Sequence, residues 1–263
     1  MDAILTLTLM HDRHLSAVSN TKLSTTEAYH WYRATYSFNK QLSRPLQAEQ
    51  QAALWTTAAL LGTITFCHIE ARTPEEAWPL KLPSSSDLDW LRMSDGKKEV
   101  WKLTQPLKAD PVFRALVAVH TNDLLPTPST KPELKALPLE FISLYGLDAT
   151  STSDNNPYHA AATGLAQILD IDRPITTILS FLTLISTMHP DYKRLLERKD
   201  PRALLLLTCW YAKVCQLQVW WLRRRAVLEG QAICIYLERH YRHEINIQTL
   251  LQFPRTIFCS LSS

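Results

Sequence analysis

The sequence predicts an all-α protein, and three observations lead to this prediction. The 263 residues contain five glycines, well below the roughly 7% usual in globular proteins, and β-turns and phosphate-binding loops depend on glycine for their positive-φ positions. Apolar residues recur at helical spacing. Asp95-Gly96 has no alternating apolar runs beside it, so it does not indicate a β-hairpin. With 46% apolar and 20% charged residues, the chain can bury a sizeable core.

Helices are expected in succession along the first half of the chain. Apolar spacing predicts a short amphipathic helix over residues 5–18, and residues 25–38 are dense in aromatic side chains. Pro45 suits the first turn of a helix and predicts one long helix over residues 45–72. Prolines and serines interrupt residues 73–104, which are expected to form a long connection with short helices. The core stripe of the long helix is expected at Leu54, Ala58, Leu61 and Thr65.

The second half is expected to hold shorter helices punctuated by proline and glycine. The predicted helices are 110–120, 139–146, 157–169, 173–188, 190–197, 201–229, 231–243 and 245–253. Gly146 is expected to stop one helix, residues 148–156 to form a polar loop, and Gly230 to kink or break the chain. A proline-rich connection at about 124–138 is the most linker-like stretch of a single domain, residues 1–263.

Charge, cysteine content and hydropathy narrow the class of protein. The 28 basic and 25 acidic residues give a net charge of +3, too balanced for a dedicated DNA-binding surface. The five cysteines are odd in number and widely spaced, as expected for reduced thiols in a cytoplasmic protein. The apolar stretch 50–69 carries polar side chains and the stretch 175–188 is short, so no membrane span is expected.

Familiar catalytic and metal-binding motifs are missing from the sequence. It has no glycine-rich dinucleotide or phosphate loop and no Gly-x-Ser-x-Gly esterase motif. Cys209 and Cys215 are six residues apart, which on a helix places them about 120° from a common face. The pairs His11–His14 and His240–His243 have a suitable spacing but no identifiable third ligand. The arginines from Arg223 to Arg225 fan out round a helix and indicate a solvated face. We therefore expect neither a metal nor a cofactor.

Aromatic residues point to a hydrophobic pocket for a small molecule. Tryptophans and tyrosines fall on or near predicted helices and alternate with the polar side chains of His30, His68 and Cys209. An aromatic-walled ligand pocket and a plain aromatic-rich core both fit this pattern. The residues expected to bind a ligand are Trp55, Phe66, Cys209, Trp210 and Trp220.

Several loose motifs spread over most of the chain resemble a known family. They are Trp55-x4-Leu60-Leu61-Gly62-x3-Phe66, Pro83-Ser84-x2-Asp87-Leu88-x-Trp90-Leu91-x4-Gly96-Lys97-x2-Val100-Trp101, Tyr236-Leu237-Glu238-Arg239-His240 and Leu250-Leu251-Gln252-Phe253-Pro254. This arrangement resembles the C-terminal regulatory domain of fungal zinc-cluster transcription factors, in the branch of the sterol-uptake regulators. The resemblance implies an all-α fold with a hydrophobic pocket, which holds a sterol in those members. No cysteine precedes Cys67, so the six-cysteine zinc cluster is missing and direct DNA binding is not expected.

Two functions from different classes follow. The favoured one is a cofactor-free cyclase or isomerase of fungal secondary metabolism, of pericyclase type such as a Diels–Alder enzyme, acting on a terpenoid or polyketide intermediate. Such chemistry needs a substrate held in a near-attack fold and hydrogen-bond donors to polarise a carbonyl. The expected catalytic residues are His68, Tyr211 and His30, with Trp55 and Trp220 as further donors and His159 as a second acid–base residue.

The alternative is a ligand-responsive transcription regulator domain without its own zinc cluster. It would bind a sterol or another metabolite, signal through a protein partner and reside in the nucleus. A regulator returns its ligand unchanged, whereas an enzyme releases an altered product. Under both interpretations the main partner is a hydrophobic small molecule, and a second copy of the chain, forming a homodimer, is a further candidate.

Overall fold

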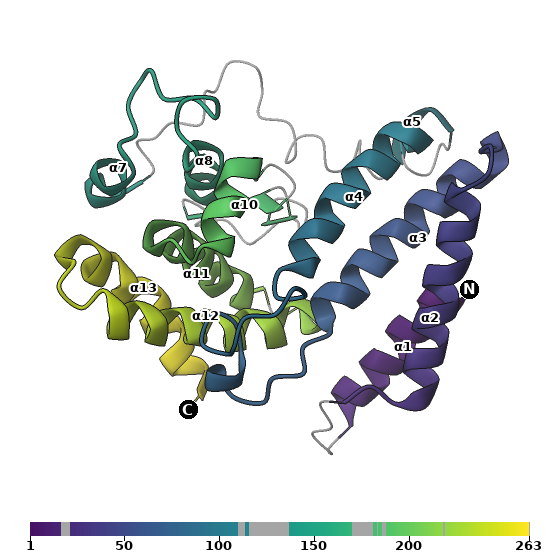
Figure 1. Cartoon of the computed structure of the whole chain (residues 1–263), viewed down its shortest axis with the longest axis horizontal. Helices are drawn as coiled ribbons and strands as arrows, with labels where there is room; N and C mark the ends of the chain where they lie inside the picture. The colour runs from purple at the N-terminus through teal and green to yellow at the C-terminus, as the bar shows by residue number, and fades with distance from the viewer. Residues whose placement is uncertain are drawn as a thin grey trace. The chain divides into compact units, whose positions relative to one another are not determined.

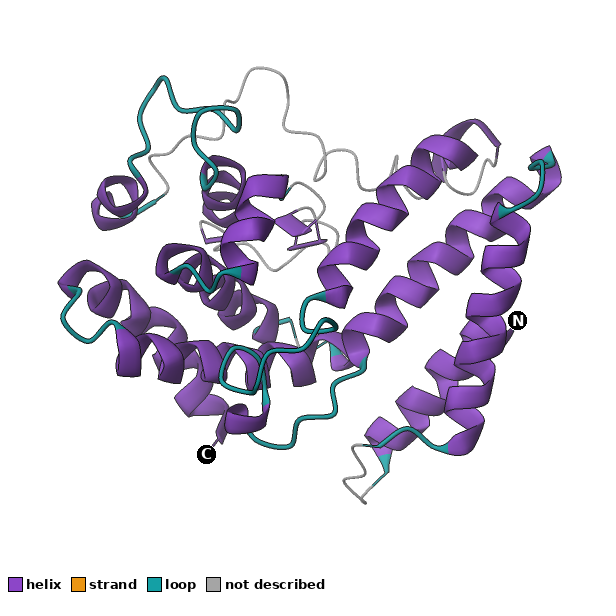
Figure 2. Cartoon of the chain, viewed as in Figure 1, coloured by secondary structure: helices purple, strands orange, loops and turns teal. Residues whose placement is uncertain are grey.

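The computed structural model is all-helical over the part of the chain that it describes (Figures 1 and 2). The described residues are 1–16, 22–109, 114–115, 137–169, 181–182, 184–185, 188–217 and 219–262. Within them no β-strand occurs. The predicted all-α class is confirmed.

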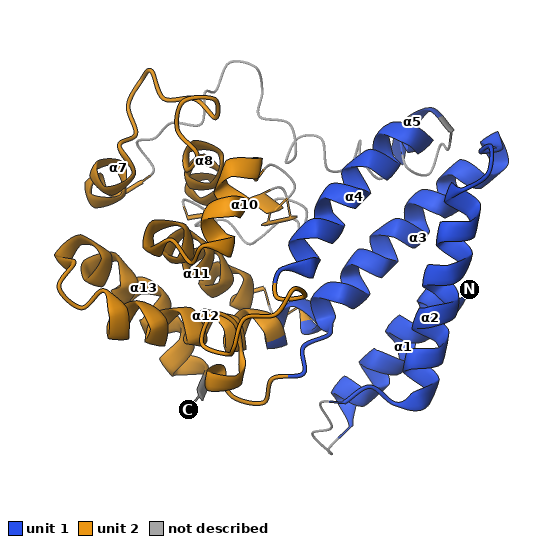
Figure 3. Ribbon diagram, in the orientation of Figure 1, with its two compact units in different colours: residues 1–70, 88–119, 220–224 blue, residues 71–87, 120–219, 225–263 orange. Residues whose placement is uncertain are grey.

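The helices group into two compact units, and each is assembled from separate segments of the chain (Figure 3). Unit 1 comprises Met1–Glu70, Leu88–Val119 and Trp220–Arg224. Unit 2 comprises Ala71–Asp87, His120–Val219 and Arg225–Ser263. The single domain of residues 1–263 stays a prediction.

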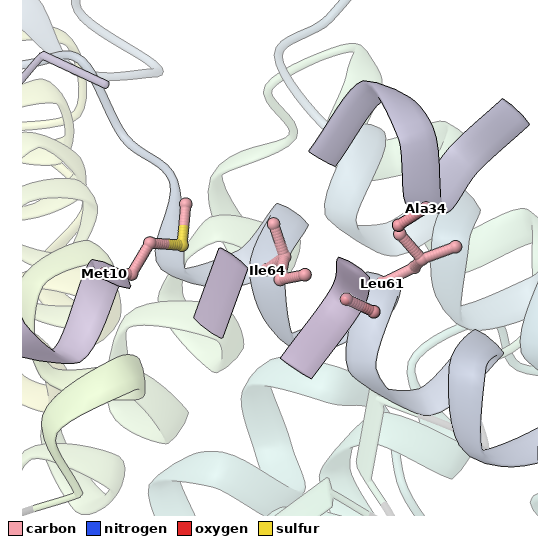
Figure 4. Packing of buried hydrophobic residues seen from close by; sticks show 5 residues of the cluster. Met10, Ala34, Leu61 and Ile64 are labelled. Atoms are coloured by element: carbon pink, nitrogen blue, oxygen red, sulfur yellow. The ribbon is translucent and has the colours of Figure 1, made fainter. Parts of the chain in front are cut away.

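Unit 1 is built around a long apolar helix. Its helices are α1 (Asp2–Leu15), α2 (Thr25–Leu42), α3 (Ala48–Cys67), α4 (Asp89–Thr104) and the short α5 (Pro106–Ala109). Helix α3 packs against α4 on one side and against α1 and α2 on the other (Figure 1). The core between α1, α2 and α3 contains Met10, Ala34, Leu61 and Ile64 (Figure 4).

A buried carboxylate joins the first two helices of unit 1. Glu27, which is 1% exposed, accepts hydrogen bonds from Arg13 Nε on α1 at 2.8 Å and from the Ser24 backbone N–H at 2.6 Å. Ser24 Oγ in turn accepts from the Glu27 N–H at 3.1 Å, which completes a capping box at the start of α2. The same side chain therefore starts one helix and ties it to its neighbour.

Unit 2 surrounds one largely buried helix. Its elements are η1 (Pro74–Glu76), α7 (Leu139–Tyr145), α8 (His159–Leu169), α10 (Pro190–Glu197), α11 (Pro201–Cys215), α12 (Trp220–His240), whose first five residues belong to unit 1, and α13 (Ile245–Ser262). Helix α11 packs against α8, α10 and α13. Twelve of its 15 residues are buried, as expected for a helix that is apolar all round. Asp200 caps it by accepting a hydrogen bond from the Ala203 N–H at 2.9 Å.

Several predicted elements agree with the structure. Gly146 ends α7 in the left-handed region, with φ of +57°, and α10 has its predicted bounds of 190–197. The loop 148–156 contains no helix, and the helix predicted at 157 begins at His159. The long helix predicted over residues 45–72 is observed as α3 (Ala48–Cys67), which is shorter. Its stripe is buried as predicted at Leu54, Ala58 and Leu61, while Thr65 is half-buried.

Three predicted boundaries are wrong. The predicted connection 73–104 consists for half of its length of the helix α4. The buried face of α4 includes the polar residues Ser94 and Thr104, so the sequence shows no clear apolar period there. The helix 201–229 is divided before Trp220, and Gly230 lies inside α12 rather than at a break. The last helix continues through Pro254 to Ser262 instead of ending at residue 253.

Some predictions fall mostly outside the described residues. These are the helices 110–120 and 173–188 and the proline-rich connection 124–138. In the described part of the chain, no helix combines the length and the apolar character needed to cross a membrane.

Candidate functional site

A buried polar triad in unit 2 is the strongest candidate for a site. Tyr211 lies on α11, and Arg225 and Glu229 lie one turn apart on α12. The Tyr211 hydroxyl donates a hydrogen bond to Glu229 Oε2 at 2.5 Å, and Arg225 Nη1 donates to Glu229 Oε1 in an ion pair. The three residues are 0%, 8% and 2% exposed, respectively. We call these three residues the buried triad.

Burial decides the protonation behaviour of the buried triad. Loss of water raises the pKa of the Glu229 carboxyl, while the guanidinium of Arg225 and the hydrogen bond from Tyr211 act in the opposite direction. Burial and the neighbouring Glu229 charge raise the pKa of the Tyr211 phenol well above its usual range, so the phenol keeps its proton. A phenol that donates a hydrogen bond to a carboxyl of raised pKa is a suitable acid–base pair.

The side chains beside Tyr211 on α11 are buried and apolar in character. Burial raises the pKa of the Cys209 thiol, so this group stays neutral. The Trp210 indole N–H donates to the carbonyl of Phe181 at 3.0 Å, and its ring lies 5.2 Å from that of Tyr211. These contacts fix Trp210 and place an apolar ring beside Tyr211.

Three further tyrosines meet the start of α11 in unit 2. Tyr145 donates to the Arg202 carbonyl at 2.9 Å, Tyr192 to the Ala203 carbonyl at 2.9 Å and Tyr158 to Asp200 Oδ1 at 3.0 Å. Burial raises the pKa of each phenol. Each of these hydroxyls is engaged by the first turn of α11, so they hold this helix in place. Nothing in the sequence pattern singles out these tyrosines, although the pattern predicts the helix that begins at residue 201 and that they contact.

The eight residues predicted for the site are divided between the two units. His30, Trp55, Phe66, His68 and Trp220 belong to unit 1, and Cys209, Trp210 and Tyr211 belong to unit 2. Whether they bind a ligand or act in catalysis stays a prediction. Of the three adjacent α11 residues, Tyr211 belongs to the buried triad, the Trp210 ring contacts that of Tyr211, and Cys209 is buried on the same helix.

The two predicted catalytic histidines of unit 1 each lie near a carboxylate. His30 Nδ1 on α2 is 2.8 Å from Asp2 Oδ1 on α1. His68, directly after α3, places Nε2 3.9 Å from Glu70 Oε1, and its ring centroid is 5.3 Å from that of Trp31. The half-buried His159, at the start of α8 in unit 2, has a pKa lowered by burial, and its Nδ1 has no hydrogen-bond partner in the described structure.

The three predicted ligand-binding aromatics of unit 1 each pack against other rings. Phe66 packs edge-on against Trp90 at 5.2 Å and Trp221 at 6.0 Å. Trp55 packs edge-on against Trp101 at 4.8 Å. The rings of His11 and His14 lie 4.8 and 5.7 Å from Trp220. Each of these three side chains therefore packs against rings of another helix.

Sequence analysis missed two of the three members of the buried triad. The prediction of a solvated face for Arg223–Arg225 is wrong, because Arg225 is buried and the two preceding arginines are half-buried. The sequence does contain one indication of this pair, since Arg225 and Glu229 have opposite charges at i and i+4 on either side of the apolar run Ala226–Leu228. That spacing is also common on exposed helices, so it did not distinguish a buried pair from a surface one.

Neither a cluster of metal ligands nor a known relative helps to assign a function to this site. Among the described residues, no three or more histidine, cysteine or acidic side chains gather where they could hold a metal ion. Comparisons of the chain with protein-family models, curated proteins and solved structures found no match.

Proposed function

We propose that this protein is a cofactor-free isomerase or cyclase that binds a hydrophobic terpenoid or polyketide intermediate. The observation that carries the proposal is the buried triad: a carboxyl that is 2% exposed and hydrogen-bonded by a fully buried phenol. Ionisable groups placed in an apolar interior with a displaced pKa are typical of acid–base sites.

The buried triad supplies the parts of a proton-transfer reaction. In this scheme the single Tyr211 hydroxyl proton shifts from Glu229 Oε2 to a substrate carbonyl oxygen, where the hydrogen bond stabilises the charge that develops, and this shift leaves Oε2 free to act as the base. Glu229 removes a proton from one carbon, and a proton that has exchanged with solvent is delivered to another carbon, so in ordinary water the product has the mass of the substrate. Arg225 holds the carboxylate between the two steps. The apolar residues of α11 favour a lipophilic substrate.

The alternative function is a ligand-responsive regulator domain, and a specific feature of the buried triad favours it. Both oxygens of Glu229 are engaged inside the triad, one by Tyr211 and one by Arg225. A polar network that satisfies itself can hold two helices together without any substrate. Under this alternative the protein binds a sterol or another metabolite and releases it unchanged.

The test is mass spectrometry of the purified protein incubated with an organic extract of its source organism. We expect one lipophilic metabolite to be depleted as an isomer of equal mass appears, and heat-inactivated protein to show no such change. Tyr211→Phe and Glu229→Gln should each reduce the rate by about 100-fold or more. Tyr192→Phe is the matched control, because it removes a buried phenol hydrogen bond from α10 to the Ala203 carbonyl of α11, outside the buried triad.

Two results would count against the enzyme. If a metabolite co-purifies and is recovered unchanged, the regulator alternative takes its place. If the isomer forms but Tyr192→Phe slows the reaction as much as Tyr211→Phe, the buried triad is a structural network and the chemistry occurs elsewhere. Far-UV circular dichroism of every variant shows whether it retains the helical fold.

A further inference from the structure

Lys97 on α4 lies directly against a glycine of α3, within unit 1. A Cβ atom built on Gly62 would be 2.9 Å from Lys97 Cδ, 3.1 Å from Cε and 3.2 Å from Nζ. The lysine side chain therefore fills the space that a side chain at position 62 would need. A glycine inside a helix lowers stability by about 0.5–1 kcal/mol relative to alanine. Here it makes room for the lysine.

Within the described part of the chain, Lys97 differs from its neighbours on α4 in its charged partners. Lys98 pairs with Asp95 at 3.4 Å and Lys102 pairs with Glu99 at 2.8 Å, both three residues earlier on α4. Among the described residues, no acidic side chain pairs with Lys97, which is half-buried. Lysines held away from water are usually paired, so this amine is available for another partner.

Aromatic rings flank Lys97 on both sides along α4. Trp90 precedes it by seven residues and contacts Phe66 of α3, and Trp101 follows it by four and contacts Trp55 of α3. Spacings of seven and four place all three α4 residues on one helix face. Lys97 thus lies between two aromatic contacts that join α3 and α4, so its surroundings are largely apolar.

We propose that Lys97 is a covalent attachment site for a hydrophobic aldehyde or ketone, which it binds as an imine. The neutral amine attacks the carbonyl carbon and forms the C–N bond. The two amine hydrogens then leave with the carbonyl oxygen as water, and the C=N bond remains, with no oxidant or reductant needed. Burial lowers the pKa of the Lys97 ammonium because the charged form loses water, which increases the neutral amine near pH 7. The site lies in unit 1 and is independent of the buried triad.

The test is trapping on the full chain with a limiting amount of cinnamaldehyde and sodium cyanoborohydride at pH 7. The reductant converts each imine to a stable secondary amine, and peptide mass mapping gives the rate at every lysine. We expect modification of Lys97 at least about fivefold faster than of Lys98 or Lys102. Equal or slower modification of Lys97 would overturn the proposal.

Two variants separate the site from general lysine reactivity. Lys97→Arg keeps the charge and should remove the fast-labelling position, whereas Lys98→Arg should leave the rate at Lys97 unchanged. Gly62→Ala places a methyl group against the lysine stem, so the rate at Lys97 should fall toward that at Lys102. If the Gly62→Ala protein keeps the wild-type circular dichroism spectrum and Lys97 still reacts at the wild-type rate, the packing of Lys97 against Gly62 has no role in its reactivity and the proposal fails. None of these readouts depends on catalytic activity.

Discussion

Gly230 and Gly62 are both interior helix glycines, yet replacement by alanine should have opposite effects on stability. In α12, a Cβ on Gly230 would lie 2.2, 2.8 and 2.9 Å from three ring carbons of Phe258, whose side chain is 2% exposed. In α3, a Cβ on Gly62 meets the flexible stem of Lys97 instead. The ring has no free space to move into, whereas the lysine stem can turn aside.

The expected magnitudes follow from these contacts. Carbon atoms normally pack at about 3.5–4.0 Å, so Gly230→Ala must displace a buried ring by more than an ångström. Overpacking of this kind costs about 1–3 kcal/mol, and this contact belongs at the upper end. The gain in helix propensity from glycine to alanine offsets about 1 kcal/mol. Gly230→Ala should therefore lower the free energy of unfolding by about 2 kcal/mol, and Gly62→Ala should leave it unchanged or raise it by up to about 1 kcal/mol.

Urea unfolding followed by circular dichroism measures both variants. Phe258→Leu in the Gly230→Ala background supplies a second readout, because a smaller side chain relieves the contact. The double variant should then be at least about 1 kcal/mol more stable than the sum of the two single changes predicts. A Gly230→Ala protein as stable as the wild type would refute the packing of Gly230 against Phe258. It would instead favour the break at Gly230 that the sequence predicts.

Three other changes test the fold and the buried triad by urea unfolding. Gly146→Ala should lower the free energy of unfolding by about 1 kcal/mol, because φ is +57° at this position. A Cβ there would meet open space, so the effect comes from backbone conformation alone. An unchanged stability would contradict the left-handed cap. Arg225→Met leaves the Glu229 carboxylate buried without its cation and should lower stability by about 3–5 kcal/mol, and a loss below about 1 kcal/mol would mean that the pair is exposed. The folded-state pKa of Glu229 is raised above its ordinary 4.5, so its contribution to stability is complete below that pH and declines as pH rises through the folded pKa. Glu229→Gln should abolish this decline, and an identical pH profile in both proteins would contradict it.

Sequence patterns predicted the fold class and those helix ends that depend on local chemistry. Gly146 and the Asp200-Pro201 pair act through their own backbone conformation and capping, so they can be identified without tertiary contacts. The role of Gly230 could not be predicted in this way, since the residue that requires a glycine there, Phe258, is 28 positions away. Helix α4 was missed for a related reason: Lys97, Ser94 and Thr104 occupy its inner face, and their burial depends on α3 and other distant partners.

The candidate site was predictable only in part. Aromatic density identified Tyr211 and its neighbours Cys209 and Trp210 on α11. Its polar partners were missed, because an arginine and a glutamate one turn apart are usual on solvated helices. Their burial follows from the packing of α12 within unit 2, which no local pattern encodes.

Solvent deuterium shows whether the buried triad moves a proton on a lipophilic substrate. The wild-type protein is incubated with the metabolite extract in D2O, and the product is analysed by mass spectrometry. We expect an isomeric product carrying one deuterium, and we expect this product to be lost in Glu229→Gln. An isomer without deuterium would contradict the proton-transfer role of the buried triad and indicate a concerted cyclisation. A metabolite recovered unchanged would contradict catalysis altogether.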